Sequence, residues 1–185
     1  GAGDNHFWRA YQLALSGPLT ISAVRFGVEV NGTAQVATVR VYTSAGAFPG
    51  GTRTLVGTTT VNLTTAPATF YTATFASPPT VPGNAIVAVE IDVPTGGMWP
   101  GANTAGESAP SYISSGTCGV PNPVTLASLG FTSHFIIDIL GTIPVIPPVV
   151  QQIAGLPSGS TFPVGTTTNT FRATDAAGNT STCSF

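Results

Sequence analysis

Apolar and polar residues alternate along most of this chain with a period of two, which is typical of β-strands with one buried face. The alternation is clearest at residues 38–42, where Val39 and Val41 share the face opposite Arg40. No stretch of a dozen residues has apolar positions at helical spacing together with caps, so we expect no substantial helix. The pattern predicts eight strands, near residues 6–15, 20–30, 35–43, 54–63, 68–76, 85–93, 111–115 and 133–140.

Turn signals separate these segments, and together they predict an all-β protein built on an antiparallel β-sandwich of jelly-roll or immunoglobulin-like (Ig-like) type. Asn31-Gly32 predicts a type I′ hairpin turn, because both residues tolerate a positive φ. Strand ladders are expected to be interrupted at residues 48–51 (FPGG), 78–79 (PP) and 82–83 (PG), since proline has no N–H donor and glycine adopts turn geometry freely. Residues 94–132 are the least regular part, and we expect them to form long excursions over one end of the sandwich.

A proline-rich connector divides the chain. Residues 141–148 contain three prolines in eight residues, a composition that favours an extended, semi-rigid linker. We therefore expect a β-sandwich domain over residues 1–140 and a short β segment over residues 149–185, too small to close a sandwich core alone. The strand-like pieces of this segment lie at residues 149–153, 161–164, 169–174 and 181–185.

Charged residues are scarce, at 6% of the chain, and the net charge is −2. The basic residues are five scattered arginines, without a lysine, and cannot form the concentrated cationic face that nucleic acid requires. No apolar run approaches the ~18 residues that a membrane-spanning helix needs. We expect neither a nucleic-acid partner nor a membrane span.

Three motifs near the C-terminus have a characteristic spacing. They read FPVGTTT at residues 162–168, ATDAAGN at 173–179 and CSF at 183–185. They resemble the second half of a HYR (hyalin repeat) domain, a family with an Ig-like fold that serves extracellular adhesion. The first half of the repeat, with the cysteine that normally partners the one matching Cys183, is absent before Val149. The resemblance implies that residues 149–185 are an incomplete Ig-like unit.

The N-terminal part resembles a β-sandwich module that recurs in secreted, multi-modular bacterial proteins. The likeness lies in ATVRVY at residues 37–42, GAFPGG at 46–51 and APSYI at 109–113. It implies an extracellular or cell-surface location in a bacterium, and it implies no catalytic activity.

Catalytic combinations are poorly supported. Cys118, His134 and Asp138 are the residues from which a nucleophile, base and orienting acid could be drawn, but no nucleophile motif accompanies them. Glu90 and Asp92 share one strand face, as a glycosidase pair would require, yet their alternation with apolar residues favours a solvated face. We expect no enzyme, no cofactor and no metal site.

Ligand and glycan positions are the remaining candidates. Trp99 and Tyr112 are candidate sugar-stacking platforms, although core or edge packing is the more common role of such residues. Asn31, Asn62 and Asn179 stand in Asn-x-Ser/Thr sequons and are candidate glycosylation sites.

The two cysteines, Cys118 and Cys183, are disulfide candidates, one in each predicted module. A bridge within the chain is favoured, while bridges to a neighbouring chain stay open.

An Ig-like segment that lacks strands has unpaired backbone groups, which a strand from another chain can pair. The leading hypothesis is therefore an extracellular structural protein, a subunit of a surface fibre or pilus-like filament. Residues 149–185 or 1–15 would dock into the next copy, so that the partners are copies of the same chain. The alternatives are a carbohydrate-binding or adhesion module of a larger secreted protein, and an accessory domain of a secreted hydrolase.

Overall fold

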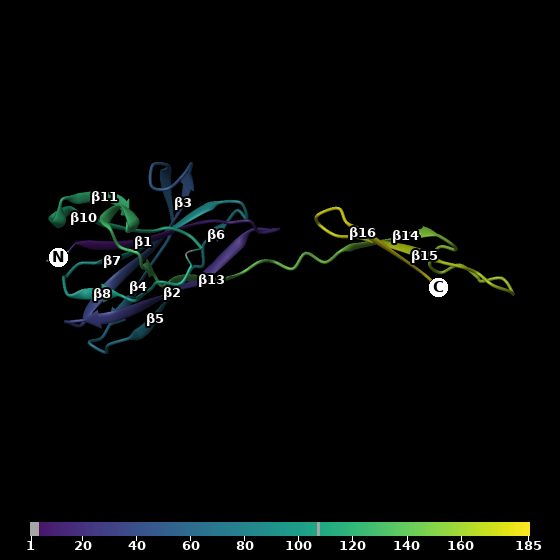
Figure 1. The fold of residues 1–185 in the computed structure, drawn as a ribbon. Helices are drawn as coiled ribbons and strands as arrows, with labels where there is room; N and C mark the ends of the chain where they lie inside the picture. The colour runs from purple at the N-terminus through teal and green to yellow at the C-terminus, as the bar shows by residue number, and fades with distance from the viewer. Residues whose placement is uncertain (1–3, 107) are drawn as a thin grey trace. The chain divides into compact units, whose positions relative to one another are not determined.

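The computed structural model describes residues 4–106 and 108–185 of the chain. These residues divide into two compact units, Gly1–Ile143 and Pro144–Phe185, and each is considered by itself. The described residues include no apolar helix of membrane-spanning length. Regular structure in both units consists almost entirely of strands (Figure 1).

The described residues of the first unit form thirteen strands and two short 3-10 helices. The strands are β1 (Asn5–Gln12), β2 (Leu19–Asn31), β3 (Gln35–Ala45), β4 (Thr52–Leu63), β5 (Thr69–Thr74), β6 (Thr80–Val81), β7 (Ile86–Val93), β8 (Met98–Pro100), β9 (Ala102–Asn103), β10 (Ser111–Ser115), β11 (Val120–Thr125), β12 (His134–Phe135) and β13 (Ile137–Thr142). The 3-10 helices are η1 (Gly116–Cys118) and η2 (Ala127–Leu129).

Two antiparallel sheets form a sandwich in this unit, and β9 and β12 pair as a separate two-stranded sheet. One has six strands in the order β11-β10-β1-β7-β3-β4. The other has five strands, with β13-β2-β5 as its path and β6 and β8 also paired with β2. The core includes Phe26 of β2, Val39 of β3 and Val89 of β7, which are almost fully buried. The structure therefore confirms the all-β sandwich class.

The predicted strands agree well with this architecture, because alternation marks the core-facing residues directly. Each of the eight predicted segments of the first unit contains a strand, and the segment at 133–140 contains two, β12 and β13. Residues 94–132 are more regular than expected, since they form four short strands and both 3-10 helices.

The outer face of the six-stranded sheet is also covered, which the alternation did not reveal. The tip of the β3–β4 hairpin places Phe48 against Trp8 and Tyr112, with ring centroids 5.7 Å and 4.7 Å away. Ala88 of β7 is fully buried beneath this second apolar cluster. The central strand β7 is consequently buried on both faces over most of its length.

The predicted hairpin turn at Asn31-Gly32 is wrong. The strands on either side, β2 and β3, belong to different sheets, and neither Asn31 nor Gly32 has a positive φ. The Asn31 amide is buried instead, and its Nδ2 donates a hydrogen bond to the carbonyl oxygen of Thr64 at 2.9 Å. Gln35 Nε2 donates to Asn31 Oδ1 at 2.8 Å, so the residue anchors a crossing between the sheets.

The second unit is a single antiparallel sheet of β14 (Val149–Ala154), β15 (Thr170–Thr174) and β16 (Thr180–Ser184), in that order. Asn169 is the only buried residue between Pro144 and Phe185. The strand predicted at residues 161–164 is absent, because Pro163 cannot donate to a ladder and Gly165 follows with φ of +123°. This unit has no hydrophobic core of its own.

Candidate functional site

The first candidate site is a cleft at one end of the sandwich, which we call the Trp99 cleft. It measures about 490 Å³ and is bounded by β1, the β8–β9 segment and the residues around η2 and β12. The irregular region of the sequence therefore supplies most of its walls. The residues that line it are Asn5, Phe7, Glu29, Gly97, Met98, Trp99, Pro100, Ala102, Ile113, Leu126, Phe131, Ser133 and Phe135.

Two aromatic rings of this cleft are open to solvent. Trp99 is 65% exposed and Phe131 is 57% exposed, whereas Phe135 behind them is buried. β8 holds Trp99 in place by pairing with β2, where Trp99 lies opposite Val30. A large exposed aromatic ring on a paired strand offers a surface against which a ligand can stack.

Polar groups converge on the same cleft. Asn5 is only 8% exposed, and its side chain makes no hydrogen bond with any residue that the structure describes. None of its amide atoms is fully enclosed, so the amide reaches the cleft surface as an unused donor and acceptor. Glu29 contributes an exposed carboxylate without an ion pair to a described residue.

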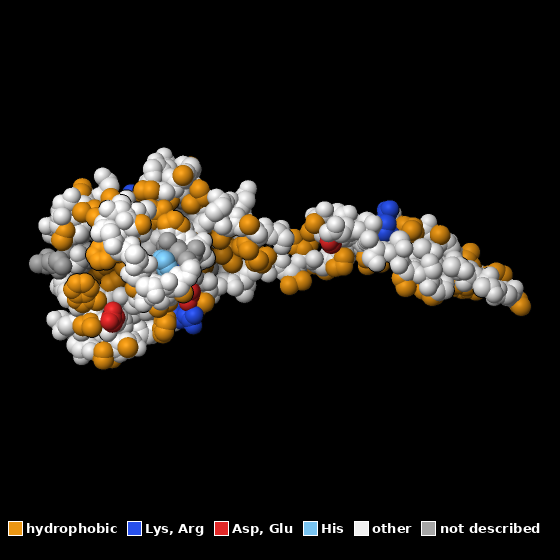
Figure 2. Space-filling model, viewed as in Figure 1, with side chains coloured by type: hydrophobic (Ala, Val, Ile, Leu, Met, Phe, Trp, Pro, Cys, Tyr) orange, Lys and Arg blue, Asp and Glu red, His pale blue; other side chains and the backbone are white. Residues whose placement is uncertain are grey.

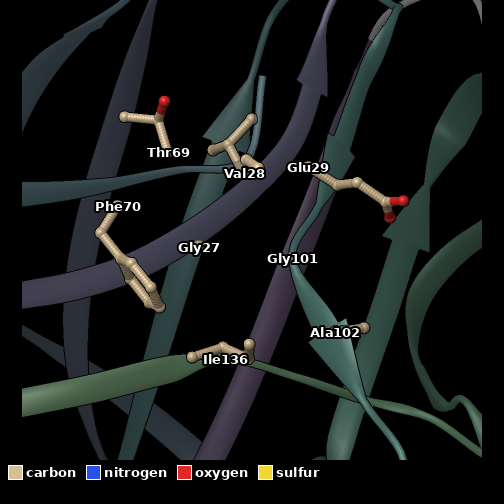
Figure 3. Close-up of a pocket in the computed structure, with 9 residues that line it drawn as sticks. Gly27, Val28, Glu29, Thr69, Phe70, Gly101, Ala102 and Ile136 are labelled. Carbon is tan, nitrogen blue, oxygen red and sulfur yellow. The ribbon is translucent and has the colours of Figure 1, made fainter. Parts of the chain in front are cut away.

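A smaller hollow of about 210 Å³ adjoins Glu29 on the five-stranded sheet. Its floor is backbone, because Gly27 and Gly101 cross so closely that a Cβ on Gly101 would lie 3.0 Å from Gly27. Figure 3 shows Glu29 pointing away from Phe70 and Ile136, which line the other side of this hollow. Glu29 also lines the Trp99 cleft, so its carboxylate is available to a ligand there.

The second candidate site lies on the outer face of the six-stranded sheet, and we call it the Glu90 cluster. Glu90 is only 4% exposed and sits on β7 between β1 and β3. His6 Nδ1 lies 2.7 Å from Glu90 Oε1, and Tyr42 donates its hydroxyl to Glu90 Oε2 at 2.7 Å. Arg40 Nη1 bridges Glu90 Oε2 at 3.2 Å and Asp92 Oδ2 at 3.0 Å.

The N-terminal residues join the Glu90 cluster through His6. Its Nε2 lies 2.9 Å from Asp4 Oδ1, and the backbone N–H of Gly116 donates to Asp4 Oδ2 at 3.1 Å. The hydrogen bond with Glu90 outweighs the opposing effect of burial and, with the help of Asp4, raises the pKa of His6 to about 9. His6 is consequently a cation at neutral pH and donates from both ring nitrogens.

Burial alone would raise the pKa of Glu90, but the hydrogen bonds from His6, Tyr42 and Arg40 outweigh it. The pKa of Glu90 is therefore lowered, and the carboxylate stays ionised. The expected solvated face is wrong for Glu90, because the three side chains that bind its carboxylate leave it only 4% exposed. Among the described residues no group of His, Cys, Asp or Glu side chains is placed to hold a metal ion.

The predicted ligand and glycan residues fare differently in the structure. Trp99 is exposed and stays a candidate stacking platform, whereas Tyr112 is buried beneath Phe48 and offers no platform. Asn62 and Asn179 are exposed, but Asn31 lies in the interior. A glycan on Asn31 Nδ2 would have to enter the interior beside the hydrogen bond to Thr64, so we no longer expect one there.

Each cysteine is a free thiol in the unit that holds it, so neither unit supports the disulfide favoured from the sequence. Cys118 ends η1 in the first unit and Cys183 lies on β16 in the second, and both thiols are free and exposed. The hydrogen bonds with Ser115 and Thr117 lower the pKa of the Cys118 thiol. An edge strand and a surface turn of separate units leave each thiol facing solvent.

The structure does not assemble the set formed by Cys118, His134 and Asp138. Asp138 binds Arg25, whose Nη2 donates to Asp138 Oδ2 at 2.7 Å. His134 Nε2 donates to the carbonyl oxygen of Ala105. Both partners are thus engaged elsewhere.

Sequence analysis missed both Asn5 and the Glu90 cluster. A signal for the cluster exists, because His6, Arg40 and Glu90 all occupy the outward positions of strands that turned out to be neighbours. Only the strand order β1-β7-β3 brings these positions together, and alternation within one strand does not determine that order.

A family of known proteins matches the C-terminal part of the chain. The HYR domain family matches residues 119–185, a longer stretch than the motifs near the C-terminus. The match begins within the first unit, where β11 and β13 pair with β10 and β2 rather than with β14–β16. No curated protein matches the chain.

A solved structure shares the fold. It is a crystal structure of the cysteine protease and lectin-like domains of Cwp84, a surface layer associated protein of Clostridium difficile. The match has a TM-score of 0.53 at 11% identity, and it covers 77% of this chain and 33% of that chain, so this chain spans about a third of its neighbour. The chain thus has a fold similar to part of a surface-layer protein, and its C-terminal part resembles a HYR domain.

Proposed function

We propose that this chain is an extracellular adhesion module that binds carbohydrate in the Trp99 cleft. The observation that carries the proposal is the exposed indole of Trp99 beside the unused amide of Asn5 and the carboxylate of Glu29. The C–H face of a sugar ring packs on an aromatic ring, while its hydroxyls need a few convergent polar partners. The cleft offers both.

The extracellular location draws on three features. The surface is poor in charge, and on the face shown in Figure 2 charged side chains form small patches among hydrophobic and uncharged polar ones. The C-terminal part resembles a HYR domain, and the structural neighbour is described as surface layer associated and as carrying lectin-like domains. Adhesion and sugar binding fit all three.

The Glu90 cluster does not have the properties that a glycosidase active site needs, which favours binding without catalysis. Glycoside hydrolysis needs a carboxylic acid whose pKa is raised so that it can protonate the leaving group. The pKa of Glu90 is lowered, and its neighbour Asp92 is held by Arg40. We therefore propose that the chain is not an enzyme.

The test is affinity electrophoresis in gels that contain neutral polysaccharides, with Trp99→Ala as the variant. We expect retardation of the unmodified chain and at least about tenfold weaker binding for Trp99→Ala, since a lost ring contact and its buried area together exceed ~1.4 kcal/mol. Phe70→Ala is the matched control, because Phe70 is 57% exposed but lines only the adjoining hollow. Equal retardation of the unmodified chain and Trp99→Ala would contradict the proposal.

A second role, as a filament subunit joined by strand addition, is favoured by one feature of the second unit. β14 and β16 are both edge strands, and Val149 and Phe185 are 73% and 74% exposed. An added strand would pair the open edges and cover apolar surface. The N-terminal segment cannot be the added strand, because β1 is already held between β10 and β7; residues 1–3 lie outside the described part.

Negative-stain imaging distinguishes this role. Filaments of the full chain that disappear when residues 149–185 are removed would support it. Monomers in both preparations would refute it and leave carbohydrate binding unaffected.

A further inference from the structure

The outer face of the six-stranded sheet concentrates the scarce charge of this protein. The chain has five basic and seven acidic residues. Five of these twelve, together with one of the two histidines, lie in the Glu90 cluster or directly beside it. Burying a charge is costly unless the charge is paired. Solubility alone requires no buried network of charges, so a cluster of this kind is a candidate for a functional site. The five charged residues are Asp4, Arg40, Arg53, Glu90 and Asp92.

A depression of about 520 Å³ opens on this face beside Glu90. Trp8 and Tyr42 form part of its wall, with Arg53 and Ser114 at the same opening. It is separate from the Trp99 cleft, with which it shares no lining residue. A ligand in this depression is therefore independent of carbohydrate binding in the Trp99 cleft.

Arg53 is the cation of this depression with free donors. Its guanidinium carbon lies 5.1 Å from the ring centroid of Trp8 and 5.8 Å from that of Phe48. Arg53 makes no hydrogen bond or ion pair with the residues that the structure describes, and it is exposed. Stacking fixes the plane of a guanidinium while its edge stays available, and that edge matches a carboxylate bidentately.

The other cations of the cluster are already neutralised. His6 uses both ring nitrogens on Glu90 and Asp4, and Arg40 bridges Glu90 and Asp92. The negative charge of Glu90 is likewise compensated by its partners, which weakens its repulsion of an incoming anion. An anionic group is therefore directed to Arg53.

Groups that can hydrogen-bond to the hydroxyls of a ligand lie at the same opening. The Ser114 hydroxyl accepts a hydrogen bond from Trp8 Nε1 at 3.0 Å, and its own proton has no acceptor among the described residues. The Asp4 side chain is 51% exposed, so its carboxylate keeps acceptor positions toward solvent. We propose that this depression binds a sugar acid, with its carboxylate on Arg53 and its hydroxyls on Ser114 and Asp4.

The test is a titration of the ¹⁵N-labelled full chain by nuclear magnetic resonance with glucuronate, glucose and acetate. The Trp8 indole N–H reports on this depression, and the Trp99 indole reports on the other cleft. We expect glucuronate to shift the Trp8 signal with a Kd at least about tenfold lower than that of glucose or acetate. Arg53→Gln should weaken glucuronate binding at least about tenfold, and Arg172→Gln, at an exposed arginine of the second unit, should leave it unchanged.

Arg53→Lys serves as a second variant, because it keeps the charge and loses the fork of donors. An intermediate affinity for this variant supports bidentate recognition of the carboxylate. Equal binding of glucose and glucuronate, acetate as tight as glucuronate, or full affinity in Arg53→Gln would each overturn the proposal. None of these results depends on whether the Trp99 cleft binds a neutral sugar.

Discussion

Replacing Glu90 by glutamine removes the negative charge that His6, Arg40 and Tyr42 bind in the Glu90 cluster. The variant keeps the side-chain shape but leaves His6 and Arg40 without their buried counter-charge. A hydrogen bond to a charged group is worth about 1.5–3 kcal/mol, and Glu90 makes two with cations, at 2.7 Å and 3.2 Å. Breaking a buried ion pair costs about 3–5 kcal/mol. Because His6 retains Asp4 and Arg40 retains Asp92, we expect a loss near the lower end, about 3 kcal/mol.

Urea unfolding followed by tryptophan fluorescence measures this loss, since Trp8 lies directly opposite Glu90 in the β1–β7 ladder. Asp138→Asn is the matched control, because the Arg25–Asp138 pair has similar geometry at 2.7 Å but its side chains are 49% and 39% exposed. An exposed pair is worth about 0.2–1 kcal/mol. If Glu90→Gln costs no more than Asp138→Asn, the cluster is a solvated surface and our account of its burial is wrong.

Three further results are expected. Because the folded-state pKa of His6 is raised from 6.5 to about 9, its stabilisation is complete below pH 6.5 and is lost as the pH rises through 9. The urea midpoint should fall across that interval in the unmodified chain and not in His6→Gln; parallel curves would contradict this. Expression in a glycosylating host should modify Asn62 and not the buried Asn31, so a glycan on Asn31 in peptide mapping counts against the fold. Alkylation without reductant should find two thiols per chain, Cys118 reacting faster than Cys183 because its pKa is lowered; a single or absent thiol would show a bridge.

The fold was predictable where a single strand carries the information. Val39 and Val41 are fully buried, as the alternation at residues 38–42 predicts, because one side of a strand must face the core. Trp99 could be named as a candidate platform from its place in a stretch rich in glycine and proline, although packing in the core or at an edge was the more common expectation. Both inferences use local sequence only.

The failures share a cause, which is contact between residues distant in sequence. Asn31 has the sequence of a hairpin turn, but hydrogen bonds with Thr64 and Gln35 make it a buried anchor between sheets. Glu90 reads as a solvent-facing position until His6, Arg40 and Tyr42, from the neighbouring strands β1 and β3, bind its carboxylate and cover it. Contacts between strands that are distant in sequence decide both cases, and they do not follow from alternation.

The second unit shows the complementary limit. Its motifs identify the HYR resemblance, yet the strands form one sheet in which Asn169 alone is buried. The motifs predict which strands the second unit contains, but they do not predict what covers the apolar side chains of those strands. These side chains are exposed in the second unit, so a partner would have to cover them.

Carbohydrate binding in the Trp99 cleft is tested most directly by titrating the full chain with neutral oligosaccharides and following its two indole N–H signals. Trp8 is buried with its N–H bonded to Ser114, and Trp99 is exposed, so the two signals report on separate sites. The account predicts that a neutral oligosaccharide shifts the Trp99 signal in a saturable manner and leaves the Trp8 signal in place. A panel of neutral oligosaccharides that leaves the Trp99 signal unmoved, or moves only that of Trp8, would contradict it.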